Sequence, residues 1–413
     1  MSNFNLTCSM SLTFALIKER KSPPDKRVVM TPEQCVLFKT RFPEARLIVE
    51  SSNIRIFSDQ QYRDLGIEVL EDVSFADIFL GVKEVPISAL VEEKAYLFFS
   101  HTIKKQPYNQ GLLQAICEKK IALYDHETFI SDSGRRLIGF GRYAGIVGAY
   151  NGFRLYGLKM KSFDLPKVED LYDYDAVKEA LNKIVLPDNF KTLITGRGKV
   201  ALGAKEIVDH IGISKVTPDE LLAEGHKGPS YAMLDLEDYN RHKEGKGFDR
   251  REFYEFPERY EGNFDRFTRV INMFIAGHFY GSGAPIILTR EAMADPECRL
   301  KIVADVSCDI DGPVACTLRP STIAAPFYGY NPQTHLEVDL DAPDAIGVMA
   351  VDNLPCELPR DASHGFGEQF LAQIAPSFFD GDAEGVLSRA QITDSMGRLT
   401  PRFCYLQYYA LGH

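Results

Sequence analysis

Short apolar runs alternate with amphipathic stretches through the first 130 or so residues, and this alternation limits the fold more than any other feature. The apolar runs are LTFALI, ARLIVE, ADIFLGV, AYLFF and KKIALY. Between them, TPEQCVLFKTRF and SDQQYRDLG begin with the Thr31/Gln34 and Ser58/Gln61 spacing of a capping box, which predicts helices at both places. Strands that alternate with helices predict an α/β domain with a parallel sheet.

The chain has 413 residues, which is longer than a single hydrophobic core usually grows, so we expect two domains. We predict a discontinuous first domain, built from residues 1–140 and 321–413, with a nucleotide-binding domain inserted at 141–320. The glycine-rich stretch GFGRYAGIVGAYNGFRLYG predicts a buried, closely packed helix at the start of the insertion. The fold class we expect is therefore α/β, with two Rossmann-like domains and parallel sheets.

Composition and charge exclude several classes of partner. Forty-seven Lys and Arg against 58 Asp and Glu leave a net charge of -11, which repels polyphosphate backbones and disfavours nucleic acid. No apolar run approaches the roughly 20 residues of a membrane span. The opening MSNFNLTCSMS also lacks the charged start and apolar core of a signal peptide. We expect a cytoplasmic protein with small-molecule substrates, as a monomer or a small homo-oligomer.

Cysteine and histidine spacing gives no sign of a metal site. The eight cysteines are scattered without a CxxC pair, which predicts reduced, mostly packing residues. The histidines show neither HxxxH nor HExxH spacing, so we expect no metal. His126 and His278 are among those that we interpret as packing or surface residues.

Charged side chains follow four of the predicted strands. Lys18 follows LTFALI, Lys83 and Glu84 follow ADIFLGV, His101 follows AYLFF, and Glu127 closes the DHE that follows KKIALY. Charged residues often follow strands simply because loops are exposed to solvent. If the strands are parallel, however, all four sets lie at one sheet edge, where open α/β sheets bind ligands.

A lysine, an imidazole and carboxylates at one cleft are the groups that proton transfer requires. Arg27 and the pair Arg135 and Arg136 are candidates to clamp substrate carboxylates. In an acidic protein, such a cationic pocket indicates an anionic small substrate.

A glycine turn in the middle of the chain indicates a dinucleotide site. It follows the strand FKTLIT and opens a helix, the context in which backbone N–H groups approach a pyrophosphate. Its spacing departs from GxGxxG because the third glycine, Gly203, comes two positions late. The next strand, ISKV, ends at Thr217 without an acidic residue for a ribose. An ordinary tight turn is the alternative. The candidate cofactor residues of the turn and its helix are Gly196, Arg197, Gly198, Lys199, Val200, Gly203 and Ala204.

Several long segments resemble a known family. KERKSPPDKRVVMTPEQC is similar to the opening of alanine dehydrogenase and of the transhydrogenase nucleotide-binding subunit. GVKE, FFSHTIKKQPYNQGLL and LYDHETFISDSGRRLIGFGRYAGIVG narrow the resemblance to saccharopine dehydrogenases that form lysine and to lysine-ketoglutarate reductase. MAVDNLPCELPRDASHGFGE and ITDSMGRLTPRFCYLQ extend it to the carboxyl-terminal part of the chain.

The resemblance implies a substrate domain and a Rossmann domain with NAD or NADP as the cofactor. It implies interconversion of saccharopine with lysine and 2-oxoglutarate, with Lys83 and His101 as the acid–base pair. The residues matching groups around the substrate are Lys18, Arg27, Glu84, Glu127 and Arg136. Thr217, Asp305 and Asp309 are weaker candidates on the cofactor side, and the last of these also suits a simple turn with Gly312 and Pro313.

Two alternative functions fit the same sequence. One is an alanine dehydrogenase-like amino acid dehydrogenase, and the other is a nucleotide-binding regulatory protein without catalysis. The choice between NAD and NADP, the direction of the reaction and the division of roles between Lys83 and His101 stay open. Lys215 and Arg197 are both able to accept a 2′-phosphate.

Overall fold

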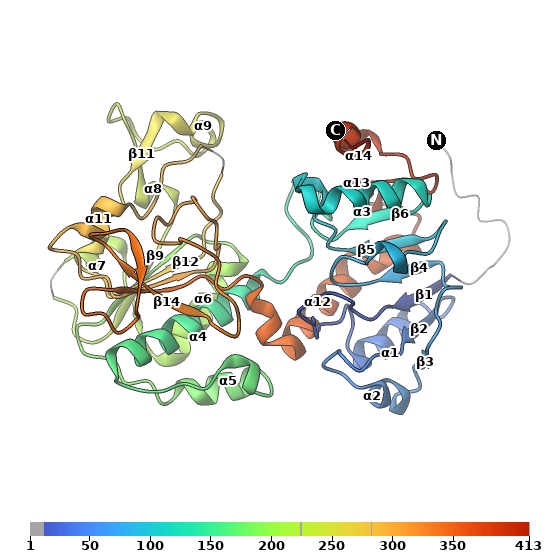
Figure 1. Ribbon diagram of the computed structural model, residues 1–413, viewed down its shortest axis with the longest axis horizontal. Coiled ribbons are helices and arrows are strands. Elements are labelled where there is room, and N and C mark those ends of the chain that lie inside the picture. Colours follow the sequence, from blue (N-terminus) through green and yellow to red (C-terminus); the bar gives the residue numbers. More distant parts are fainter. Residues whose placement is uncertain (1–11, 224, 282, 413) are drawn as a thin grey trace. The chain divides into compact units, whose positions relative to one another are not determined.

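The computed structural model describes residues 12–223, 225–281 and 283–412. The opening segment and Cys8 therefore lie outside the described residues. The chain divides into two compact units, residues 1–140 with 359–413 and residues 141–358 (Figure 1). In the described part of the chain, no helix combines the length and the hydropathy that crossing a membrane requires.

Unit 1 contains a parallel six-stranded sheet in the order β3-β2-β1-β4-β5-β6. Its strands are β1 (Thr13–Leu16), β2 (Arg46–Glu50), β3 (Glu68–Leu70), β4 (Ile78–Leu80), β5 (Ala95–Phe98) and β6 (Ala122–Asp125). Its helices are α1 (Pro32–Arg41), α2 (Asp59–Asp64), α3 (Pro107–Glu118), α12 (Pro359–Gln373), α13 (Val386–Ala390) and α14 (Gln407–Ala410).

Both faces of this sheet are buried, as a parallel sheet requires. Phe14 and Leu16 point to the face covered by α1, α12 and α13. Ala15 points to the opposite face, which α3, α14 and the short turn Pro401–Leu406 cover. The predicted capping boxes are present: Thr31 begins α1 and Ser58 begins α2, each paired with its glutamine three residues on.

Unit 2 contains a mixed eight-stranded sheet in the order β15-β14-β16-β13-β12-β7-β9-β8. Its strands are β7 (Lys191–Thr195), β8 (Ser214–Lys215), β9 (Ser230–Leu234), β12 (Met273–Ala276), β13 (Ile302–Asp305), β14 (Phe327–Asn331), β15 (Leu336–Val338) and β16 (Ile346–Met349). A separate hairpin joins β10 (Asn240–His242) to β11 (Tyr260–Gly262). The helices are α4 (Gly141–Met160), α5 (Tyr174–Leu181), α6 (Lys199–Ile211), α7 (Pro218–Leu222), α8 (Leu236–Tyr239), α9 (Arg250–Glu255), α10 (Asp265–Thr268) and α11 (Arg290–Ala294).

Two features of unit 2 differ from the sequence prediction. The chain stays in unit 2 until Leu358, not residue 320, because β16 pairs in parallel with β13 and carries the antiparallel strands β14 and β15 with it. The proline- and glycine-rich composition after Val306 concealed these strands. The sheet is therefore mixed and not purely parallel as expected, because β14 pairs antiparallel with both β15 and β16.

The glycine-rich stretch forms the buried helix α4, as predicted. Its glycines allow an unusually close approach to α6. A Cβ on Gly145 would lie 1.8 Å from the carbonyl oxygen of Val200, and one on Gly203 would lie 2.0 Å from that of Arg142. Only hydrogen fits at either position, so these two glycines fix the helix pair in place.

We expect Gly145→Ala to lower the free energy of unfolding of unit 2 by about 2 kcal/mol or more, because the added methyl group forces α4 away from α6. Gly111→Ala in α3 is the matched control, since its added Cβ would meet only the Ile87 side chain, at 3.7 Å. Alanine is the better helix former by about 1 kcal/mol, so the control variant should be neutral or slightly stabilised. Chemical unfolding followed by circular dichroism measures both, and equal effects of the two substitutions would contradict this account.

Candidate functional site

The four strands that carry charged tips are parallel neighbours. β1 pairs with β4, β4 with β5, and β5 with β6, all in parallel. Their carboxyl ends therefore meet at one edge of the unit 1 sheet, as the sequence analysis anticipated.

The acid–base cluster at this edge consists of Lys83, Glu84 and His101. Nδ1 of His101 lies 2.5 Å from Oε1 of Glu84, and both side chains are mostly buried, at 18% and 14% exposed. A carboxylate only accepts, so Nδ1–H donates, and Nε2 is the ring nitrogen left to exchange a proton. His101 has a left-handed φ of 54°, which turns the chain sharply at the end of β5.

Several partners stabilise the charged form of Glu84. Burial by itself would raise the pKa of this carboxyl, but the hydrogen bond from His101, a backbone N–H and the Lys21 ammonium together lower it to about 2. Nζ of Lys21 lies 3.1 Å from Oε2. Glu84 is therefore ionised at neutral pH and available to orient the imidazole.

Glu19, which the sequence analysis did not select, fixes the backbone beneath Lys83. Its buried carboxyl accepts the backbone N–H groups of Val82 at 2.7 Å and Lys83 at 2.9 Å. Burial raises the pKa of Glu19 to about 7. Its place directly after Lys18, at the tip of β1, was the one available sequence signal.

The predicted substrate-binding residues have partners of their own. The Lys18 ammonium lies 3.6 Å from Glu50. The guanidinium of Arg27, itself buried, binds Asp25 through two nitrogens and stacks over Phe140. The substrate-binding roles of both side chains stay predictions.

Glu127 lies between two cations. Its Oε1 is 3.4 Å from Lys104 and 3.1 Å from Arg136. Burial works against ionisation, but these cations outweigh it and lower the pKa of Glu127. Its Oε2 is buried without a hydrogen-bond partner among the described residues, so this atom can accept one from a ligand. Arg135 is exposed beside the pair.

His126 packs in the core of unit 1, as expected. It is fully buried against Phe99 and Phe366, and Nε2–H donates to the carbonyl oxygen of Gly81 at 2.9 Å. Burial lowers its pKa to about 4, so the ring is neutral. The neighbouring Asp125 caps the tip of β5 by accepting the backbone N–H of Ser100.

The glycine turn of unit 2 connects β7 to the 13-residue helix α6. Gly196 has a φ of +95°, and a Cβ there would lie 2.8 Å from the carbonyl oxygen of Gly277, so only glycine is tolerated. Gly198 is the N-cap residue and faces open space. Arg197 and Lys199 are exposed beside it.

The remaining turn candidates face α4. The α4 residues Gly145 and Arg142 contact Val200, Gly203 and Ala204. The third glycine of a dinucleotide-binding turn has the same role, because it allows close packing of the helix. Direct contact of these three with a cofactor stays a prediction.

The weaker cofactor candidates all have local structural roles. Thr217 is the N-cap of α7 and bonds Glu220. Asp305 is fully buried and accepts from Ser307 and Thr317. Asp309 begins the turn that Gly312 closes, since the Gly312 N–H donates to its carbonyl oxygen.

Two further residues lie near the glycine turn, and the sequence analysis selected neither of them as a ligand-binding residue. Asp235 directly follows β9, and β9, not β8, is the strand paired with β7. An acidic residue therefore lies at the tip of the strand beside β7, although none follows ISKV. His278, interpreted from sequence as a packing or surface residue, is 8% exposed, with Nδ1 bonded to Thr195 and Nε2 without a partner among the described residues.

These features fit a nicotinamide dinucleotide. The open glycine turn at an α6 N-terminus suits a pyrophosphate, Asp235 suits a ribose diol, and the buried Nε2 of His278 can hydrogen bond to the same ligand. Only the order of the strands in the sheet places Asp235 beside the glycine turn, and no local sequence pattern indicates that order.

Part of the sequence and the architecture of the chain are similar to those of known proteins. Residues 15–147 match the family model described as alanine dehydrogenase/PNT, N-terminal domain. A solved L-alanine dehydrogenase superposes with a TM-score of 0.66 at 15% identity, over 97% of this chain and all of that one. This chain thus has the alanine dehydrogenase fold.

The sequence relatives include the saccharopine enzymes, in agreement with the motifs. The chain is 29% identical to alpha-aminoadipic semialdehyde synthase of Arabidopsis thaliana over 95% of its own length and 41% of that protein. It is 25% identical to saccharopine dehydrogenase [NAD(+), L-lysine-forming] of Yarrowia lipolytica over 79% of its own length and 83% of that protein. The chain spans about two fifths of the synthases that it matches, and its resemblance to the saccharopine enzymes is confirmed.

We expect His101→Ala to raise the pKa of Glu84 by about one unit or more, because burial persists after the hydrogen bond is lost. In the wild-type protein the pKa of Glu84 lies below its ordinary value of 4.5. Ionised Glu84 therefore stabilises the folded state at pH values above 4.5, and this stabilisation is lost as the pH falls toward 2. In the variant this acid-sensitive contribution should shrink. NMR titration of the carboxyl carbons measures the shift, with Asp72 as the internal control, and an unchanged Glu84 titration would refute the pairing.

Proposed function

We propose that the chain is an oxidoreductase that interconverts saccharopine with lysine and 2-oxoglutarate, using NAD or NADP. The observation that supports this most is the His101–Glu84 pair beside Lys83 at one sheet edge. The relatives named saccharopine dehydrogenase and alpha-aminoadipic semialdehyde synthase support the same substrate class. The cofactor's part is to accept or return a hydride.

The reaction requires controlled proton movement. Saccharopine loses hydride from the carbon beside its secondary amine only when that nitrogen is unprotonated. Water then adds to the resulting imine carbon, and the carbon–nitrogen bond breaks to leave lysine and 2-oxoglutarate. One group must therefore hold the amine proton and return it to the departing nitrogen, and another must take a proton from water.

We assign the amine and imine steps to Lys83 and the water step to His101. His101 suits deprotonation of water because Glu84 holds Nδ1–H and leaves Nε2 as the base. Lys83 suits the nitrogen steps because Glu19 fixes its backbone at the tip of β4. The assignment can be exchanged between the two residues without changing the balance of protons.

The substrate carboxylates need cations. We propose Lys18, Arg27, Arg135 and Arg136 for this role, with Glu127 near the same groups. Arg136 already lies 3.1 Å from Glu127, so a substrate carboxylate would share this guanidinium.

Two alternative functions fit the same fold. The alanine dehydrogenase fold favours an alanine dehydrogenase-like amino acid dehydrogenase, which would reduce the cofactor with alanine. The second alternative, a regulatory nucleotide-binding protein, was suggested because no acidic residue for a ribose follows ISKV. The position of Asp235 at the tip of β9, beside β7, weakens that suggestion. The cytoplasmic location and the oligomeric state stay predictions, and the relative from Rattus norvegicus is named as mitochondrial.

We expect Lys83→Met and His101→Gln each to lower turnover of saccharopine about 100-fold or more, the usual contribution of a general acid or base. Affinity for the cofactor should be unchanged, since neither residue belongs to unit 2. Turnover is followed by the absorbance of the reduced cofactor in both directions, and cofactor affinity by calorimetry. Lys119→Met, at an exposed ion pair with Glu92, is the matched control.

Wild-type rates in both variants would remove the proposed mechanism. Cofactor binding by the wild-type protein without turnover of saccharopine, or of lysine with 2-oxoglutarate, would favour the regulatory alternative. Turnover of alanine but not saccharopine would favour the other.

A further inference from the structure

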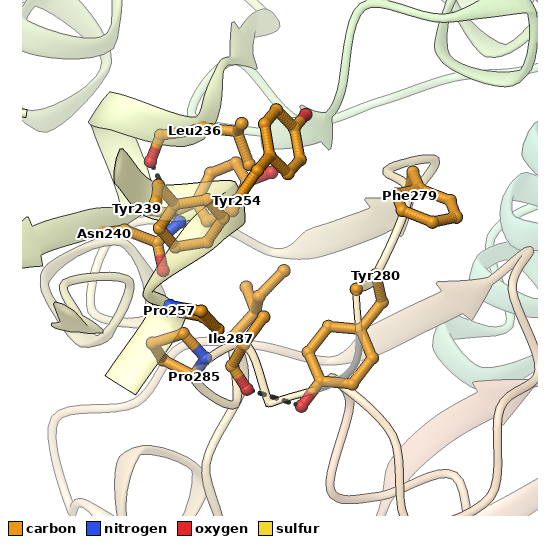
Figure 2. A pocket seen from close by; sticks show the side chains of 12 residues that line it. Leu236, Tyr239, Asn240, Tyr254, Pro257, Phe279, Tyr280, Pro285 and Ile287 are labelled. Atoms are coloured by element: carbon orange, nitrogen blue, oxygen red, sulfur yellow. Dashed lines mark hydrogen bonds between the residues drawn. The ribbon is translucent and has the colours of Figure 1, made fainter. Parts of the chain in front are cut away.

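A cavity in unit 1 has walls of a different chemistry from those of a groove in unit 2. The groove, shown in Figure 2, is walled largely by tyrosine and phenylalanine rings, and no charged side chain is among the described residues that line it. The cavity, which we call the unit 1 pocket, has a volume of about 500 Å³, part of it open to solvent. Its lining includes Arg20, Glu50, Glu71 and Asp72. The unit 1 pocket can therefore select a ligand by its charge.

The unit 1 pocket lies at the carboxyl ends of three neighbouring strands. Ile17 directly follows β1, Glu50 ends β2, and Glu71 directly follows β3. The apolar part of the lining includes Phe79 and Val85, which belong to the core on the α3 side of the sheet. The pocket thus combines an apolar floor with charged groups at the edge where open α/β sheets bind ligands.

Negative charge exceeds positive charge in the lining of the unit 1 pocket. Three carboxylates, those of Glu50, Glu71 and Asp72, stand against the one guanidinium of Arg20, which leaves an excess of two negative charges. Glu50 is 4% exposed, whereas Glu71 and Asp72 are exposed and lie at the mouth. Hydrogen bonds from Ser74 lower the pKa of Asp72, so this carboxylate is ionised at neutral pH. A cation is the ligand that this charge distribution favours.

A buried hydroxyl of the lining has unused hydrogen-bonding capacity. Tyr96 is 1% exposed, and its hydroxyl oxygen accepts the backbone N–H of Val91 at 2.9 Å. The second lone pair of this oxygen and the hydroxyl proton have no partner among the described residues. A primary ammonium can donate to that lone pair, and an attached aliphatic chain can pack on the apolar floor. The lining therefore fits a primary ammonium on an unbranched aliphatic chain.

Glu50 connects the unit 1 pocket to the segment that follows β1. Its Oε2 accepts the backbone N–H of Lys18 at 3.0 Å, and its Oε1 lies 3.6 Å from the ammonium of the same residue. Arg20 donates to the same Oε1, and its guanidinium also binds the carbonyl oxygen of Lys18. An ammonium that enters the pocket beside Glu50 would compete with both of these cations for one carboxylate.

The alternate residues of the same segment hold the acid–base cluster. Glu19 accepts the backbone N–H of Lys83 at 2.9 Å, and Nζ of Lys21 lies 3.1 Å from Oε2 of Glu84. Residues 18 and 20 thus contact Glu50, while residues 19 and 21 contact the cluster, as successive side chains of an extended chain point to opposite sides. A shift of this segment at Glu50 is therefore transmitted to the residues that position Lys83 and Glu84.

We propose that the unit 1 pocket is an effector site for a primary ammonium on an unbranched aliphatic chain, and that its occupant acts on Lys83 through Glu50 and residues 18–21. The occupant takes a share of the Glu50 carboxylate from Lys18, and the hold of the segment on Lys83 changes with it. The proposal rests on the proposed function, in that Lys83 is taken to belong to the acid–base pair. The side chain of lysine and a free alkyl diamine share the chemistry of the occupant.

The first test measures binding to the full chain by calorimetry with cadaverine, lysine and norleucine, which has the same chain without the terminal ammonium. We expect cadaverine to bind and norleucine not to bind. Glu71→Gln combined with Asp72→Asn should weaken cadaverine about tenfold, because two ion pairs at the mouth are lost. Ala89→Leu, which narrows the pocket without changing its charge, should weaken cadaverine as well. Glu44→Gln, at an exposed carboxylate of unit 1 outside the lining, is the matched control.

The lysine arm distinguishes the two sources of the ammonium. Affinity for lysine that falls in the same two pocket variants identifies lysine as the occupant. Sensitivity of cadaverine alone identifies a free diamine.

The second test follows the backbone amide signal of Lys83 by NMR in protein labelled with ¹⁵N-lysine, where its absence in Lys83→Met assigns it. Cadaverine should shift this signal in the wild-type protein and not in the pocket variants. Cadaverine should also lower turnover of saccharopine about fivefold or more in the wild type alone.

Equal cadaverine affinity in the wild type and both pocket variants, or no binding at all, would overturn the proposal. Binding that leaves the Lys83 signal in place would overturn it too. A cadaverine-dependent shift of this signal in a protein that does not turn over saccharopine would refute the proposed function alone.

Discussion

Parallel strand pairing is the constraint on which both candidate sites depend. In a parallel sheet every strand delivers its carboxyl end to the same edge, so residues far apart in the chain become neighbours there. In unit 1 this brings Glu84, after β4, within hydrogen-bond distance of His101, after β5. In unit 2 it brings the tips of β9 and β12 to the two sides of the glycine turn.

Close helix packing is the second requirement, because the glycine turn has to be held rigidly. Gly145 and Gly203 let α4 and α6 approach until backbone touches backbone. The helix that begins at the turn is thereby fixed along its length. Part of the glycine pattern that resembles a cofactor fingerprint therefore serves packing. Gly196 provides the positive φ of the turn, and Gly198 faces open space where a ligand can approach.

The acid–base cluster shows how neighbouring groups keep a largely buried carboxylate ionised. Glu84 is ionised because His101, a backbone N–H and Lys21 outweigh its burial. Glu19, one strand away, has its pKa raised to about 7 because backbone N–H groups compensate its burial only in part. The same residue type thus serves as an orienting anion in one place and as a backbone anchor in the other.

Much of the architecture was readable from local patterns. Capping boxes at Thr31 and Ser58 and the alternation of strands and helices predicted the α/β fold. The family motifs also singled out Lys83 and His101, whose acid–base roles stay predictions. The predicted end of unit 2, at residue 320, was too early. Strands β14 to β16 lie in a stretch whose composition is typical of loops, and β16 pairs with β13, which lies far before it in the sequence.

The sequence by itself determined which side chains end the strands and where the chain must turn, since both follow from local periodicity and backbone freedom. Only the tertiary structure decided which strand lies beside β7. That choice places Asp235 at the tip of the strand beside the glycine turn. Strand order is set by long-range packing of whole faces, which no local spacing records.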